Sequence, residues 1–326
     1  MKTYVLTGNA SPALKLCDQP APKAGPGEVV VNMKAASLNY RDLLVAEQTQ
    51  GNIPLSDGAG IIRAVGTDVV NFKSGDRIVI GFMPGWVEGD FSAEKKTCSL
   101  GGPGVNGVLA EQVTVAASGV TRIPDSLSFE EAATLPCAGV TAWSALFERR
   151  PLLPGETVLL LGTGGVSIFA LQLAKLTGAR VIITSSSDEK LRRARELGAD
   201  FTINYRNNPE WADEVIKLTG GIGADLTVDV TGPATLNASL KATRSGGRIS
   251  LMGVLSGFSG SIDTAAILEK RITLQGIYVG PVSTLGALVR TPIKPYIDKV
   301  FTFEDAESAY QTLREKNHFG KLVINI

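Results

Sequence analysis

Short apolar runs separated by turns dominate the first 122 residues of the chain. The turns are rich in glycine, proline and aspartate, a pattern typical of an all-β fold. The number and spacing of the runs predict a small, strongly twisted barrel, interrupted by one helix at Asn39–Glu47 and by a polar, glycine-rich loop at 83–107. The predicted strands are Tyr4–Leu6, Val29–Lys34, Ile61–Val65, Arg77–Ile80 and Leu109–Val115.

Beyond residue 122 the pattern changes to apolar runs that alternate with helical periodicity. Two helices are predicted first, at Ser128–Leu135 and Ala138–Arg149. Strand-like runs then alternate with further helices, which predicts a doubly wound parallel sheet of about six strands in an α/β fold. The predicted strands are Thr157–Leu161, Val181–Ile183, Phe201–Tyr205, Leu226–Val230, Arg248–Met252 and Ile272–Val279.

The last part of the chain, residues 280–326, has mixed character. It predicts a short helix, a strand at Lys299–Phe303, a helix at Asp305–Glu315 and a closing strand at Leu322–Ile326. We expect the closing strand to rejoin the N-terminal domain. The domain with the parallel sheet is then an insertion, and a ligand is expected in the cleft between the domains.

A glycine-rich turn, residues 162–167, lies between a wholly apolar strand and a helix predicted at Ile168–Leu176. The first glycine permits a tight turn, the next lets backbone N–H groups approach a pyrophosphate, and the helix N-terminus stabilises the anion. Ser167 stands where this fingerprint usually has glycine or alanine, and the glycines alone could be turn chemistry only. The predicted pyrophosphate-binding residues are Gly162, Gly164, Gly165 and Val166.

The residues that follow the second strand indicate which nucleotide binds. About twenty residues beyond the glycines, an NAD site usually has a carboxylate against the ribose 2′-hydroxyl. This chain has Ser185 there, followed by Ser186 and then Lys190. Hydroxyls and an ammonium suit a 2′-phosphate, so we predict NADP rather than NAD. The alternative is that Ser186 and Glu189 form a capping box for a helix at Asp188–Leu197, and both interpretations can hold together.

Composition narrows the class of protein. Lysine plus arginine and aspartate plus glutamate number 32 each, so no net charge recruits nucleic acid or a membrane surface. No apolar run is long enough to span a membrane, and the N-terminus starts as a strand without a signal peptide. Three widely spaced cysteines, Cys17, Cys98 and Cys137, favour a reducing compartment. We therefore expect a cytoplasmic protein.

Several short motifs are spread along the chain besides the glycine turn. They are Gly25-Pro26-Gly27-Glu28-Val29, Gly58-Ala59-Gly60 with Val65-Gly66, Gly75-Asp76-Arg77-Val79, Ala138-Gly139-Val140-Thr141-Ala142 and Phe319-Gly320-Lys321-Leu322-Val323. Together they resemble the medium-chain dehydrogenase/reductase superfamily over essentially the whole chain, and within it the zinc-free quinone oxidoreductase branch that includes zeta-crystallin. The resemblance implies a GroES-like β-barrel catalytic domain, residues 1–125 completed by 280–326, and an inserted doubly wound Rossmann domain, residues 126–279.

The residues that distinguish this branch lie at the positions where zinc alcohol dehydrogenases have their zinc ligands. In the resemblance, Asn39 stands where zinc alcohol dehydrogenases have a cysteine, and Ser56-Asp57 stands where they have His-Glu. Only Cys137 matches a catalytic ligand position, and one thiolate cannot supply the three protein ligands that a catalytic zinc needs. The structural zinc lobe is also missing, since the 83–107 loop contains only Cys98. We expect no metal.

Without zinc, the resemblance implies a reaction that needs little Lewis-acid help. Hydride transfer from NADPH to a quinone or an activated alkene spreads charge over a conjugated system, and a few hydrogen-bond donors can stabilise that charge. The resemblance places Asn39 near the nicotinamide ribose and the substrate oxygen, with Tyr40 as a neighbouring donor and Ser56 as a weaker candidate. Their structural alternatives are a helix N-cap, core packing and a turn, respectively.

Further assignments follow from the resemblance. Thr141 is implied as a nicotinamide contact, and the 2′-phosphate would be reached by Lys190 and Tyr205. The remaining predicted cofactor contacts follow the fifth and sixth strands of the sheet and are Gly253, Val254 and Tyr278. The last strand, Ile272–Val279, is an apolar sheet edge, which predicts a homodimer.

Three other functions stay open at this stage. The first is a zinc-free alcohol or ketone dehydrogenase. The second is a nucleotide-binding protein with little turnover. The third is a methyltransferase-type Rossmann domain, although that domain would have an acidic residue at the position of Ser185.

Overall fold

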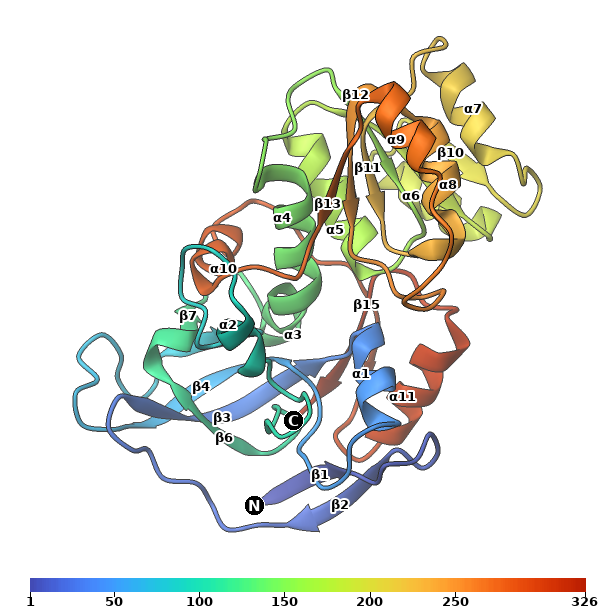
Figure 1. The fold of residues 1–326 in the computed structure, drawn as a ribbon. Coiled ribbons are helices and arrows are strands. Elements are labelled where there is room, and N and C mark those ends of the chain that lie inside the picture. Colours follow the sequence, from blue (N-terminus) through green and yellow to red (C-terminus); the bar gives the residue numbers. More distant parts are fainter. The chain divides into compact units, whose positions relative to one another are not determined.

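The structure, a computed structural model, describes residues 1–326 and divides into two compact units. The first unit comprises residues 1–140 and 279–326, and the second comprises residues 141–278 (Figure 1). The predicted insertion therefore ends within one residue of the expected place but begins fifteen residues later than the predicted 126. None of the helices has the length and apolar character that crossing a membrane requires.

A seven-stranded sheet forms the centre of the first unit. The strands follow the order β14-β15-β3-β4-β5-β7, and β6 also pairs with β3. A separate antiparallel pair, β1 and β2, completes the β-structure. Of these strands, β2 and β7 were not predicted from the sequence. The bounds are β1 (Lys2–Leu6), β2 (Leu14–Asp18), β3 (Glu28–Ser37), β4 (Asp57–Val65), β5 (Arg77–Ile80), β6 (Gln112–Ala116), β7 (Val120–Arg122), β14 (Ile297–Phe301) and β15 (Lys321–Asn325).

The long strand β3 organises this sheet. One of its edges pairs with β4 along most of its length. The other edge is shared: residues 28–32 pair with β6, and residues 35–37 pair with β15. The closing strand thus rejoins the first unit, as predicted. The pairing of β3 with β15 is antiparallel, with Ser37 opposite Val323. The two residues that follow β3 therefore lie beside the start of β15.

Five α-helices belong wholly to the first unit: α1 (Tyr40–Ala46), α2 (Ala93–Thr97), α3 (Phe129–Ala133), α10 (Val282–Leu288) and α11 (Ala306–Glu315). Helix α1 matches the prediction, since Asn39 is its N-cap and Glu47 its C-cap. Helix α3 packs on β3 and β4 and buries Ala132 and Ala133 completely. This packing explains why residues 126–140, which include the π-helical turn Leu135–Gly139, belong to the first unit rather than to the insertion.

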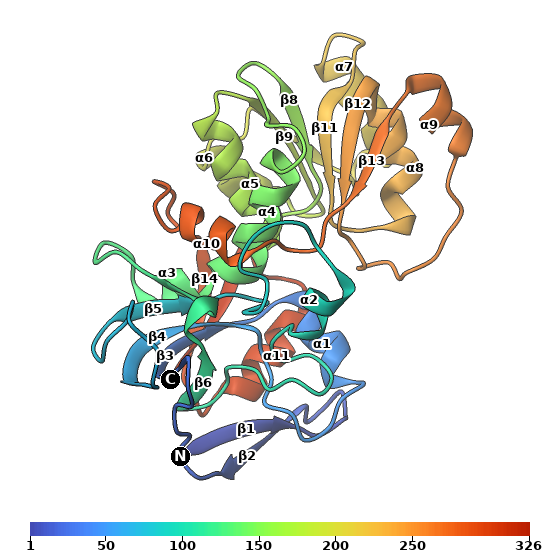
Figure 2. The ribbon, with the colours of Figure 1, turned by 60° about the vertical axis from the view of Figure 1, so that its left-hand side comes forward.

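The second unit is a six-stranded parallel sheet in the order β10-β9-β8-β11-β12-β13 (Figure 2). This is the doubly wound order, and every strand pair is parallel. Strand β13 is shorter than the predicted Ile272–Val279 at both ends, and Val279 itself has a positive φ of 54°, which an extended strand does not contain. The bounds are β8 (Thr157–Leu160), β9 (Arg180–Ser185), β10 (Phe201–Asn204), β11 (Ala224–Asp229), β12 (Thr243–Leu251) and β13 (Thr273–Gly276).

The connections between these strands are helical, as the alternation predicted. Strand β8 is buried along its whole length, which is typical of a parallel strand covered on both faces. The helices are α4 (Val140–Phe147), α5 (Gly165–Leu176), α6 (Asp188–Glu196), α7 (Trp211–Leu218), α8 (Pro233–Ala242) and α9 (Thr264–Lys270).

Candidate functional site

The glycine turn of the second unit presents open backbone. Gly162 has φ of 73°, a conformation that favours glycine, and Gly164 is the N-cap of the twelve-residue helix α5. A Cβ added at either glycine would meet no atom within 4 Å, and no side chain caps the helix. The N–H groups of the first turn of α5 are therefore accessible to an anion such as a pyrophosphate.

The serine at the third fingerprint position has a structural role. Ser167 is fully buried, and its hydroxyl donates a hydrogen bond of 2.7 Å to the carbonyl oxygen of Leu161. This bond ties the start of α5 to the end of β8. A small polar residue therefore serves here where glycine or alanine is usual.

The hydroxyl cluster at the end of β9 is arranged differently from the prediction. Helix α6 begins at Asp188, so its N-cap is Ser187, whose hydroxyl accepts the Lys190 N–H at 3.4 Å. The predicted capping box between Ser186 and Glu189 is therefore wrong. Ser185 is buried with its Oγ 3.4 Å from Thr163 Oγ1 of the glycine turn. Ser186 is half-buried and has no part in the cap.

The residues after β10 meet this cluster. Tyr205 donates its backbone N–H to the carbonyl oxygen of Ser185 at 3.1 Å, and its side chain is 42% exposed. Asp188, the only carboxylate close to this position besides Glu189, accepts a hydrogen bond of 2.7 Å from Asn204 Nδ2. The structure thus brings Ser185, the first turn of α6 and Tyr205 together at one corner of the sheet.

The remaining predicted cofactor residues are more dispersed. A Cβ on Gly253 would lie 2.0 Å from the carbonyl carbon of Val230, so this position needs glycine for packing whatever it binds. Val254 is half-buried, and Tyr278 is exposed beyond β13. Thr141 is buried in the first turn of α4.

A second cluster of polar residues lies buried in the first unit, where β3 ends beside β15. Lys321 Nζ donates hydrogen bonds to the carbonyl oxygen of Leu38 at 2.5 Å and to Asn39 Oδ1 at 2.6 Å. The Nδ2 atom of the Asn39 side chain has no hydrogen-bond partner. Because Asn39 is only 9% exposed, this is a buried donor without an acceptor.

Asp57 is the carboxyl group at the centre of this cluster. Its carboxylate accepts hydrogen bonds from Ser56 Oγ at 2.6 Å and from the backbone N–H of Cys137 at 3.0 Å. Burial raises the pKa of Asp57, and the Lys321 ammonium acts in the opposite direction. Ser56 is fully buried and its hydroxyl donates to Asp57, so this hydroxyl proton is already engaged within the cluster.

Asp42 holds the start of α1. Its carboxylate accepts the Asn39 backbone N–H at 2.7 Å and lies 3.4 Å from Arg41 Nη1. Burial raises the pKa of Asp42 from 3.8 to about 6, against the opposing effect of Arg41. Arg41 also donates to the Leu100 carbonyl oxygen at 2.9 Å, so the pair is structural. Tyr40, the first residue of α1, is half-buried and packs against the core of this unit.

The residues at the expected zinc position do not fit that metal. Nowhere in the chain do three or more histidine, cysteine, aspartate or glutamate side chains group so that they could hold a metal ion. Burial, and then the Asp57 carboxylate, raise the pKa of the Cys137 thiol well above its usual range.

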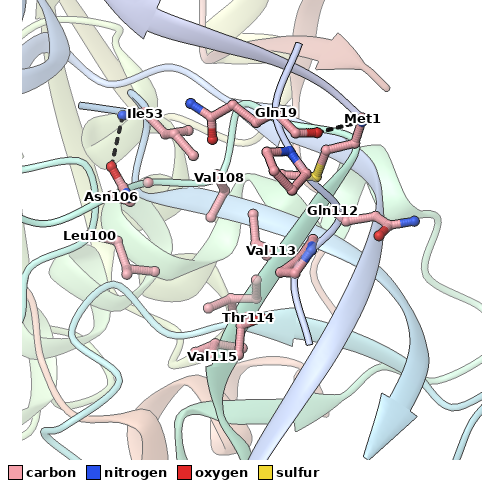
Figure 3. Close-up of a pocket in the computed structure, with 14 residues that line it drawn as sticks. Met1, Gln19, Ile53, Leu100, Asn106, Val108, Gln112, Val113, Thr114 and Val115 are labelled. Atoms are coloured by element: carbon pink, nitrogen blue, oxygen red, sulfur yellow. Dashed lines mark hydrogen bonds between the residues drawn. The ribbon is translucent and has the colours of Figure 1, made fainter. Parts of the chain in front are cut away.

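A cavity of about 260 Å³ in the first unit does not involve these residues. It lies between the segment after β2 and strand β6, and its lining includes Gln19, Val108 and Val113 (Figure 3). None of the candidate catalytic or cofactor-binding residues lines it.

Comparison with known proteins identifies the family. Residues 25–125 match the family described as "Alcohol dehydrogenase GroES-like domain", and residues 165–291 match that described as "Zinc-binding dehydrogenase". A zinc-type alcohol dehydrogenase-like protein of Schizosaccharomyces pombe is 42% identical over 323 residues, which cover 93% of this chain and 92% of that protein. Quinone oxidoreductase-like protein 2 of Bos taurus is 28% identical over 322 residues, which cover 92% of this chain and 86% of that protein. The crystal structure of an NAD-dependent alcohol dehydrogenase superposes with a TM-score of 0.91 at 36% identity and covers 100% of both chains.

A GroES-like unit, a Rossmann unit and an open glycine turn define a nicotinamide-dependent oxidoreductase. The chain belongs to the medium-chain dehydrogenase/reductase superfamily. The resemblance seen in the sequence is confirmed at this level, as is the fold class. The sequence reasoning did not identify Lys321 or Asp42 as members of the site. A charged residue at the start of the apolar run 322–326 was the available signal for Lys321.

We predict that Gly164→Ala weakens NAD(P)H binding about tenfold or more, because the new methyl group occupies the space in front of the N–H groups of α5. The free energy of unfolding should change by less than about 1 kcal/mol, since the methyl group meets no protein atom. Cofactor fluorescence titration and urea denaturation measure the two effects. The matched control is Gly286→Ala in α10, which should leave cofactor affinity unchanged.

We predict a pH-dependent effect of Asp42→Asn on stability. An aspartate whose pKa rises from 3.8 to about 6 on folding binds more protons in the folded state between these values, so it lowers stability as the pH increases. Between pH 4.5 and 7.5 the wild-type protein should lose about 2 kcal/mol of unfolding free energy relative to the variant. Urea denaturation at the two pH values measures this difference, and a constant difference would contradict the assignment.

Proposed function

We propose that the protein is an NADPH-dependent reductase of quinones or activated alkenes and that it works without zinc. The observation that carries this proposal is the buried Asn39 Nδ2, a donor without a partner, in a cluster that cannot supply three metal ligands. The quinone oxidoreductase-like protein of Bos taurus among the relatives also supports it. The nicotinamide, when bound, would supply a hydride.

The chemistry suits the donors that are present. A hydride added to the β-carbon of an α,β-unsaturated carbonyl, or to a quinone, moves an electron pair onto the conjugated oxygen. Asn39 Nδ2 and the Tyr40 hydroxyl would donate to that oxygen and stabilise its charge. Water would supply the proton that completes the reduction, because the only histidine, His318, is not among these residues. A simple alkoxide concentrates its charge and depends more on a metal.

The preference for NADP rests on the corner formed by β9, α6 and β10. Ser185 and Ser186 supply hydroxyls at the end of β9, and Lys190 lies in the first turn of α6. The nearby carboxylate of Asp188 is held by Asn204. This arrangement favours a 2′-phosphate over a free 2′-hydroxyl. One relative is an NAD-dependent alcohol dehydrogenase, so the cofactor needs a direct test.

A second candidate function is a zinc-free alcohol or ketone dehydrogenase. The names of the S. pombe relative and of the NAD-dependent structure favour this function. It predicts that saturated ketones and simple alcohols react faster than conjugated acceptors. A nucleotide-binding protein with little turnover would instead bind NADPH and reduce neither class.

We predict that conjugated acceptors are reduced well ahead of saturated ketones. Asn39→Ala and Tyr40→Phe should each lower kcat by on the order of 10²-fold, since each removes one donor to the developing oxyanion. NADPH affinity should stay within a few-fold. The measurement is NADPH oxidation against a panel of quinones, enones, aldehydes and ketones, with elemental analysis of the purified protein.

Two outcomes would contradict this proposal. Faster turnover of saturated ketones and alcohols would favour the dehydrogenase function. About one zinc per chain, with activity lost in a strong chelator, would show that the reaction depends on metal. Ser56→Ala serves as a comparison, because its hydroxyl donates to Asp57 and we expect a smaller effect on kcat than that of Asn39→Ala.

We predict that Lys190→Ala weakens NADPH binding about tenfold or more and leaves NADH binding nearly unchanged. The charge-assisted contact to a 2′-phosphate contributes roughly 1.5–3 kcal/mol. Fluorescence titration with both cofactors measures the effect. The matched control is Lys217→Ala, an exposed lysine on α7. Equal losses for NADPH and NADH would show that Lys190 does not select the phosphate.

We also propose a homodimer. Strand β13 is the last strand of its sheet and has no partner in the chain on its outer edge. Unpaired edges of this kind associate unless they are protected, so a second copy would extend the sheet. Light scattering at micromolar concentration should give about twice the chain mass of 34.3 kDa. A mass near that of one chain would exclude the dimer under these conditions.

A further inference from the structure

Lys321 is an unusual residue for the interior of a protein. It begins β15, and only 3% of its surface is exposed. A buried ammonium is costly unless its N–H groups and its charge are compensated. Here the Leu38 carbonyl oxygen and Asn39 Oδ1 accept two of its hydrogens. The carboxylates of Asp57 and Asp42 lie close enough to stabilise the charge.

The hydrogen bond from Lys321 determines which way the Asn39 amide faces. An asparagine side chain has an acceptor oxygen and a donor nitrogen of nearly the same shape, so only its partners distinguish the two orientations. A lysine ammonium can only donate, and at 2.6 Å it must face Oδ1. Nδ2 is then directed to the other side of the amide.

Asp57 favours the same orientation. Burial raises the pKa of Asp57, while the Asn39 amide lowers it, as a donor directed toward that carboxylate does. Nδ2 is itself enclosed by protein and forms no hydrogen bond there, so it is a buried donor left without an acceptor. Ser56 and the Cys137 N–H hold the Asp57 carboxylate in place behind this amide.

We propose that Lys321 is a positioning residue that keeps Asn39 Nδ2, rather than Oδ1, directed at the oxygen of the substrate. This inference rests on the proposed function, in which Asn39 is a donor to the conjugated oxygen. In the opposite orientation Oδ1 would face the developing negative charge and repel it. Lys321 itself touches neither substrate nor cofactor and acts only through Asn39.

Two variants of similar size separate the hydrogen bond from the charge. Lys321→Gln loses the charge but keeps N–H donors for Oδ1, whereas Lys321→Met loses both. We expect kcat for the best conjugated acceptor to fall by roughly 10- to 100-fold in Lys321→Met, with NADPH affinity within a few-fold. Lys321→Gln should retain several-fold more activity than Lys321→Met. Equal losses in the two variants would overturn the positioning role and indicate that the charge alone matters.

A double-mutant comparison tests whether Lys321 acts through Asn39. If it does, Lys321→Met should have almost no further effect on kcat in a protein that already carries Asn39→Ala. Independent, multiplying losses would overturn the proposal. Lys321→Met could fail to fold because the Asp57 and Asp42 carboxylates lose their cation. The double variant Lys321→Met with Asp57→Asn, which removes the ammonium and one carboxylate together, then replaces Lys321→Met in the comparison.

A structural measurement decides the proposal even if the wild-type protein reduces none of the acceptors, an outcome that would refute the proposed function alone. In protein labelled with ¹⁵N-asparagine, the Asn39 side-chain NH₂ signal is identified by its loss in Asn39→Ala. Relaxation should show this group to be rigid in the wild type and in Lys321→Gln, and mobile in Lys321→Met. A group that stays rigid in Lys321→Met would show that Lys321 does not orient the amide.

Discussion

The pairing of β15 with the end of β3 is the constraint on which the first unit depends. It joins residues 321–325 to residues 35–37 and so closes a unit whose two segments are separated by the whole Rossmann insertion. It also places the Lys321 ammonium beside the residues that follow β3. The same backbone pairing therefore completes the sheet and assembles the polar cluster, and a change in register would disrupt both.

The buried polar cluster shows how charges affect one another in a protein interior. Burial raises the pKa of Asp57, and the Lys321 ammonium and the Ser56 hydroxyl act in the opposite direction. The Cys137 thiol is then disfavoured as a thiolate by its burial and by Asp57. Charge balance in a buried site depends on all of its members, so a change in one charged residue alters the protonation of the others.

The Rossmann unit follows a simpler principle. The glycine turn, the end of β9 and the end of β10 meet because the carboxyl ends of adjacent parallel strands lie at one edge of the sheet. Hydrogen bonds across this edge, such as that between Tyr205 N–H and the Ser185 carbonyl oxygen, bring the predicted cofactor-binding residues together. Its doubly wound parallel sheet could thus be predicted from the alternation of strands and helices. The N-cap of α6 was misplaced by one residue because both Ser186 and Ser187 are suitable caps.

The sequence by itself determined the elements whose signals are local. The βαβ unit around Gly162–Ser167, helix α1 with its N-cap Asn39, and the return of the closing strand all follow from periodicity and from glycine and capping residues within a few positions. Only the tertiary structure decided the contents of the buried site, because Lys321 and Asn39 lie 282 residues apart. No local pattern encodes a hydrogen bond over that separation. It forms because β15 pairs with β3, and a buried ammonium must then find acceptors where that pairing places it.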